Sequence, residues 1–229
     1  MRVERGTALA GFAFVAATAG TVVSDARGPD ITNTAAQVTA QIASDRAGVL
    51  INSVLHIALG VSVVFLAAGL ATLIAQRGGR RMVPLVALAA GVMTAAASLL
   101  SAVLSATVAS SIQHLDGTQA PYLLYRAAQT SGTASIIFFA ITIAAAVIGL
   151  SRAGLLSAAK ARTGLAVAIA LLAGGFDYLA PDAGPLSVVE PIAGVLALVY
   201  VVLIGVRLLG TSPAADPDHV HASTSAAST

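Results

Sequence analysis

Cysteine is absent from the sequence, which excludes disulfide bonds, thiolate metal sites and cysteine nucleophiles. Charge is scarce as well, since Asp, Glu, Lys and Arg make up 10% of the 229 residues, against roughly 25% in soluble domains. Hydrophobic residues reach 57%, and the mean hydropathy is +0.90. This composition leaves little room for a soluble domain and predicts an integral membrane protein.

Standard catalytic motifs are also missing. The sequence contains no HExxH zinc motif and no glycine-rich phosphate-binding loop. His56 and Ser62 lie on one predicted helix about 240° apart around its axis, so they cannot form a serine–histidine pair by themselves. We therefore predict no catalytic residues, no metal site and no cofactor, and we favour a protein that is not an enzyme. Acid–base catalysis by Asp177 and Glu190 is the alternative.

Six apolar runs are long enough to cross a bilayer, whose hydrocarbon core needs about 20 helical residues. They cover residues 7–24, 49–75, 83–112, 127–150, 163–179 and 186–209. The runs are apolar on every side, whereas the strands of a β-barrel would alternate apolar and polar residues. We predict an all-α fold, with a six-helix transmembrane domain over residues 1–209 and a disordered cytoplasmic tail over residues 210–229.

The basic residues favour one orientation of these helices. Of the 12 lysines and arginines, nine lie at the end of the bundle that also carries both termini, and only Arg27, Arg46 and Arg126 lie at the other end. Short cytoplasmic loops are enriched in Lys and Arg. We therefore expect both termini in the cytoplasm and a multi-pass protein of the bacterial inner membrane.

The first span also has features of a secretory signal peptide. It has a basic start, a short apolar run and an Ala17-Thr18-Ala19 triplet that suits cleavage. We favour retention of this helix, because the apolar run continues through Val23. Cleavage would leave five helices in the same orientation.

A short amphipathic helix is predicted between the first two spans. Its apolar residues follow steps of four, three and four and are Ile31, Ala35, Val38 and Ile42. This spacing places them on one face of a helix. We expect this helix to cover the bundle or rest at the membrane interface, and a gating lid is the alternative.

The segment SRAGLLSAAKAR, residues 151–162, joins two spans at the cytoplasmic end. It carries Leu155 and Leu156 between basic residues. We expect the two leucines to rest on the membrane, with the basic side chains directed towards anionic headgroups.

Few polar residues lie within the spans, and they are the candidate ligand-binding residues because hydrocarbon otherwise excludes such groups. They are Asn52, His56, Arg126, Gln129, Asp177 and Glu190. One interpretation is structural: Arg126 pairs with Asp177 or Glu190 and ties three helices together. The other is a polar pocket on the outer face for a small molecule or a lipid headgroup. In that pocket Arg126 anchors an anion and His56 responds to protons.

Small residues form two ladders on the third span. The hydroxyl ladder consists of Thr94, Ser98, Ser101 and Ser105, and the second ladder consists of Ala87, Gly91 and Ala95. Small side chains let helices approach closely, and hydroxyls can hydrogen-bond across the contact. We expect helix packing here rather than a pore lining.

Three passages resemble the six-helix bacterial membrane proteins of domain-of-unknown-function family 4386. They are LYRAAQTSGTA, AVIGLSRAGLLSAAKARTGLAVAIALLAGG and VVEPIAGVLALVYVVLIGVRLLG. The resemblance implies six spans and no established activity. From the residues we expect a non-enzymatic binder of a small ligand or lipid, or an accessory membrane subunit, and a small-molecule transporter is the alternative. Membrane lipids and a protein partner or second copy are the expected partners, and no nucleic acid.

Overall fold

The computed structural model describes residues 3–25, 28–29, 33–78, 82–114, 119–179 and 189–210. In these ranges the chain is helical and contains no strand. The elements are α1 (Val3–Asp25), α2 (Ala35–Ser44), α3 (Arg46–Gln76), α4 (Met82–Ser111), the 3₁₀ turn η1 (Ile112–His114), α5 (Ala120–Arg152), α6 (Ala158–Leu179) and α7 (Val189–Gly210). The predicted tail over residues 210–229 lies outside the described residues except for its first residue.

Six helices are long and apolar enough to cross a membrane, namely α1, α3, α4, α5, α6 and α7. The all-α prediction and the six predicted spans are therefore confirmed, as is the class of multi-pass membrane protein that they define. Several helices begin earlier than the predicted spans, and the largest difference is at α5, which begins at Ala120 and not at residue 127. Pro121 suits the first turn of a helix, and Arg126 is a good helix former, so the helix runs through both.

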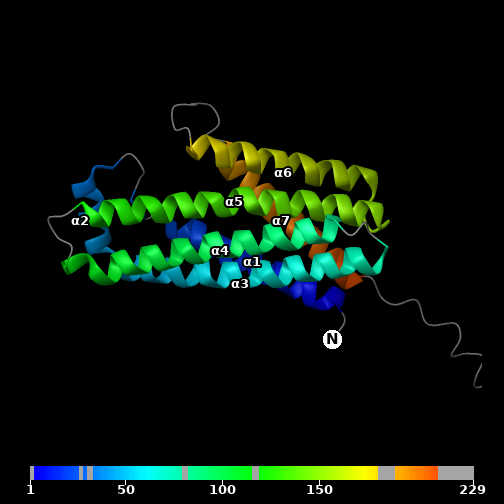
Figure 1. The fold of residues 1–229 in the computed structure, drawn as a ribbon, viewed down its shortest axis with the longest axis horizontal. Coiled ribbons are helices and arrows are strands. Elements are labelled where there is room, and N and C mark those ends of the chain that lie inside the picture. The colour runs from blue at the N-terminus through cyan, green and yellow to red at the C-terminus, as the bar shows by residue number, and fades with distance from the viewer. Residues whose placement is uncertain are drawn as a thin grey trace, which may run out of the picture.

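The six long helices run along the long axis of the molecule (Figure 1), and their contacts close a ring. Each packs against the next long helix in the chain, and α7 packs back against α1. The main apolar core fills the inside of this ring, with Phe14, Val63, Ile143 and Val201 among its buried residues. The outward faces carry large exposed apolar side chains such as Phe65, as expected of a surface that contacts lipid.

Close packing of α3 against α4 depends on small residues, as predicted from the ladder on α4. Ala87, Gly91 and Ala95 are all buried. A Cβ atom added to Gly91 would collide with the Cβ of Ala67 on α3, and one added to Gly60 would lie 3.3 Å from the Ala95 carbonyl oxygen. The two backbones can lie this close only because these positions lack larger side chains.

The predicted amphipathic helix is confirmed as α2. It begins with a capping box, in which the Thr34 hydroxyl and the Gln37 side chain each bond the other's backbone amide. Val38 and Ile42 are almost fully buried against Val108, among other residues at the ends of α4 and α5. The helix therefore covers one end of the bundle, here called the α2 end.

Two further predictions concern Ile31 and the segment with Leu155 and Leu156. Ile31, the first residue of the predicted apolar face, lies outside the described residues. The expectation for Leu155 and Leu156 is wrong, because Leu156 is buried in the main core and Leu155 packs against that core. The turn after α5 folds back tightly, with the amides of both leucines bonding the Leu150 carbonyl oxygen.

Gly91→Ala is expected to lower the free energy of unfolding by about 1–3 kcal/mol, because the added methyl overpacks the α3–α4 contact. Gly194→Ala is the matched control, since its Cβ would meet no atom within 4 Å. Alanine in a helix is otherwise about 1 kcal/mol more favourable than glycine, so the control should be neutral or stabilising. Thermal unfolding in detergent measures both, and equal effects would contradict the packing argument.

Candidate functional site

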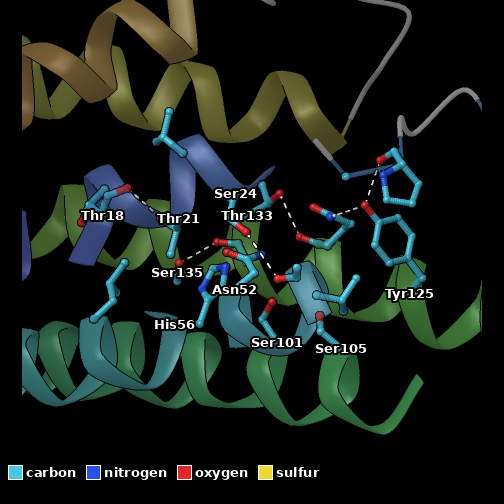
Figure 2. Close-up of a pocket in the computed structure, with 18 of the residues that line it drawn as sticks. Thr18, Thr21, Ser24, Asn52, His56, Ser101, Ser105, Tyr125, Thr133 and Ser135 are labelled. Carbon is cyan, nitrogen blue, oxygen red and sulfur yellow. Dashed lines mark hydrogen bonds between the residues drawn. The ribbon is translucent and has the colours of Figure 1, made fainter. Parts of the chain in front are cut away.

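A cavity of about 290 Å³ lies towards the α2 end, between α1, α3, α4 and α5. Figure 2 shows polar side chains from these four helices directed into one space. Of the 21 described residues that line it, thirteen have polar side chains: Thr18, Thr21, Ser24, Gln41, Asp45, Asn52, His56, Ser101, Ser105, Tyr125, Gln129, Thr133 and Ser135. The cavity reaches the surface at Asp45, whose exposed side chain accepts a hydrogen bond from the Gly48 amide.

Asn52, His56 and Gln129 are the predicted site residues that the fold brings together at this cavity. Asn52 and His56 lie one helical turn apart on α3, and Gln129 faces them from α5. Their convergence follows from the ring, because α3 contacts α5 as well as α4. Neither helix alone would form the site.

The structure does not place the other three predicted site residues at the cavity, namely Arg126, Asp177 and Glu190. Arg126 is half-buried on α5 and is not one of the residues that line the cavity. Asp177 lies near the end of α6 and Glu190 near the start of α7, but their side chains are outside the described part of the chain. The pairing of Arg126 with either carboxylate therefore stays a prediction.

His56 is held by Ser98 of α4. The Ser98 hydroxyl donates to the His56 carbonyl oxygen at 2.9 Å, and its oxygen lies 3.3 Å from Nδ1 of the imidazole. A hydroxyl has one hydrogen, and the shorter bond uses it, so Nδ1 carries a hydrogen and donates to Ser98. In the neutral ring Nε2 is then the hydrogen-bond acceptor.

Tyr125 holds Pro29, which lies between α1 and α2 in the chain and lines the cavity. The buried hydroxyl of Tyr125 donates to the Pro29 carbonyl oxygen at 2.8 Å and accepts a bond from Nε2 of Gln129, also at 2.8 Å. The ring of Tyr125 also belongs to the apolar cluster beneath α2. Tyr125 and Gln129 are four residues apart on α5, so a spacing argument could have paired them, but only the fold shows that they hold Pro29.

The opposite end of the cavity is closed by apolar side chains. Leu59 and Ile136 line it there. One turn deeper, the rings of Phe14 and Phe139 pack with their centroids 4.4 Å apart, and both belong to the main core. The cavity is therefore open towards the α2 end and closed towards the centre of the bundle.

The hydroxyl ladder on α4 has two roles along its length. Thr94 bonds the carbonyl oxygen of Ala90, one turn earlier, and is buried in helix packing. Ser98 holds His56, while Ser101 and Ser105 line the cavity. The expected packing role is therefore confirmed for Thr94 and Ser98. Ser101 and Ser105, which lie nearer α2, contribute to the polar site.

No family model, curated protein or solved structure matches the chain. The fold and cavity define the class as a multi-pass helical membrane protein, and the resemblance to family 4386 stays a prediction. Among the described residues, no three His, Cys, Asp or Glu side chains come together in a group able to hold a metal ion.

Tyr125→Phe is expected to lower the free energy of unfolding by about 0.5–1.5 kcal/mol, because the Pro29 carbonyl and the Gln129 amide both lose their partner. Faster hydrogen exchange across residues 33–45 should accompany the loss, since Tyr125 holds the adjoining chain. Tyr122→Phe is the matched control on the same helix, because no hydrogen bond of the Tyr122 hydroxyl is found within the described ranges. Equal exchange in both variants would show that Tyr125 does not fasten the connection.

Proposed function

We propose that the protein is a non-enzymatic membrane protein that binds a small polar ligand in the cavity at the α2 end. The main support is that thirteen polar side chains line one cavity of about 290 Å³ inside a bundle with an apolar core. Polar groups within membrane-spanning helices are costly, and they mark binding or transport sites. The volume is near the lower end of the roughly 300–1,000 Å³ of ligand pockets, which favours a small molecule or a single headgroup.

The proposed membrane is the bacterial inner membrane, with both termini in the cytoplasm. The distribution of Lys and Arg supports this orientation, because among the described residues Arg46 and Arg126 lie towards α2, whereas six lie at the opposite end: Arg5, Arg77, Arg152, Lys160, Arg162 and Arg207. The cavity then opens to the outer face, and Asp45 lies at its entrance. The exposed apolar faces of the ring support membrane lipids as neighbours.

A small-molecule transporter is the alternative, and the closed end of the cavity weighs against it. Transport requires a second opening towards the other side of the membrane. Here the Phe14–Phe139 pair and the core beneath it occupy the path, so the pair would have to separate. Acid–base catalysis is favoured less, since Asp45 is the single carboxylate among the described lining residues and caps α3.

Filling the cavity tests the proposal. A Cβ at Gly132 would meet only Ser101 Oγ, at 3.6 Å, so Gly132→Ala should fold normally and Gly132→Leu should extend into the cavity. Thermal unfolding is measured with glycerol, ethanolamine, acetate and phosphate as probes. At a hundredfold excess over Kd, a binding compound stabilises by about 2.7 kcal/mol.

The wild type and Gly132→Ala should be stabilised by at least one probe, and Gly132→Leu should lose that stabilisation. The proposal fails if no probe stabilises the wild type, or if Gly132→Leu responds as the wild type does.

A further inference from the structure

Four hydroxyl groups on the α1 and α5 walls of the cavity use their hydrogens on backbone carbonyl oxygens. Thr18 donates to Phe14 at 2.8 Å, and Thr21 donates to Thr18 at 2.8 Å. On α5, Thr133 donates to the Gln129 carbonyl oxygen at 3.2 Å. Ser135 donates to the Gly132 carbonyl oxygen at 2.6 Å. Because a hydroxyl has one hydrogen, these four groups present only lone pairs to a ligand.

Other groups around the cavity add acceptors, while the amides of Gln41, Asn52 and Gln129 also supply N–H donors. Tyr125 commits its hydrogen to the Pro29 carbonyl oxygen. Asp45 contributes a carboxylate at the entrance. Neither lysine nor arginine is found among the described lining residues, so no fixed positive charge balances them.

We propose that the cavity takes a small primary ammonium group, an inference that rests on the proposed function and names its ligand class. A primary ammonium carries three N–H donors, which match the hydroxyl lone pairs of α1 and α5, and its charge is complementary to Asp45. An anion would meet those same lone pairs and the Asp45 carboxylate, and no lysine or arginine among the described lining residues would balance its charge. The lining therefore suits an ammonium group better than an anion.

A quaternary ammonium fits the lining less well. Such cations have no N–H donor and are bound by cages of aromatic rings. Within the described lining Tyr125 is the single aromatic side chain, and its ring is packed beneath α2. The ligand therefore needs the N–H donors of a primary amine. A free alkylamine and the ethanolamine headgroup of a lipid both carry this group.

The absence of native cysteine permits a direct test with single thiols. Ser105→Cys places a thiol in the cavity, and Ser110→Cys places one on the exposed surface of the same helix. Each variant, in phosphatidylcholine nanodiscs, is modified with cationic 2-aminoethyl or anionic 2-sulfonatoethyl methanethiosulfonate. The ratio of cationic to anionic rate should be about tenfold higher at position 105 than at 110.

Protection then identifies the ligand and its source. Ethanolamine should slow modification at position 105, and choline should have little effect. Slowing in nanodiscs that contain phosphatidylethanolamine, without added amine, assigns the site to the headgroup. Slowing by free ethanolamine alone assigns it to a soluble amine.

Two failures are distinguishable. The ammonium assignment is wrong if the ratio of cationic to anionic modification rate at position 105 is equal to or lower than the ratio at position 110. It is also wrong if neither free ethanolamine nor phosphatidylethanolamine protects the thiol at position 105. Either result would still leave an accessible polar cavity. If that thiol reacts with neither reagent while the thiol at position 110 reacts, the cavity does not admit small solutes, and the proposed function fails with the inference.

Discussion

Polar groups inside a membrane bundle must find their hydrogen-bond partners within the protein, because hydrocarbon offers none. Within the described helices, most Ser and Thr hydroxyls meet that need locally, by donating to a carbonyl oxygen three or four residues earlier, as Thr94 and Thr142 do deep in the bundle. Around the cavity these local hydrogen bonds determine which groups a ligand would meet. Because Thr18, Thr21, Thr133 and Ser135 commit their hydrogens to the backbone, their oxygens are acceptors, which is the basis for proposing a ligand that donates hydrogen bonds.

The ring of helices and its cover maintain this arrangement. Close packing of α3 on α4 at Gly91 positions His56 against Ser98, so the imidazole is oriented by the same contact that holds the helices together. At the α2 end, the buried face of α2 and the Tyr125 hydroxyl fasten the chain that covers the cavity. The apolar core with Phe14 and Phe139 closes the other end. Together they make a polar pocket that reaches the surface at Asp45.

Much of the architecture could be predicted from sequence, because span length and the spacing of apolar residues depend on local physical rules. Those rules gave the six spans, the buried face of α2 and the small-residue contact of α4. Asn52, His56 and Gln129 were found because amides and imidazoles are rare in spans. The acceptor surface could not be predicted, since hydroxyls such as Thr21 and Ser135 are common in membrane helices. Only the arrangement of α1 against α5 across the cavity makes them one surface.

Accessibility of the cavity from the outer side of the cell is the central claim, and labelling of Ser105→Cys in intact cells measures it most directly. Ser157→Cys, exposed in the turn between α5 and α6, is the reference for the opposite end. With an impermeant methanethiosulfonate, we predict that Ser105→Cys is labelled in intact cells and Ser157→Cys only after the membrane is opened. Labelling of Ser157→Cys in intact cells, or protection of Ser105→Cys on both sides of the membrane, would contradict an outward-facing binding cavity.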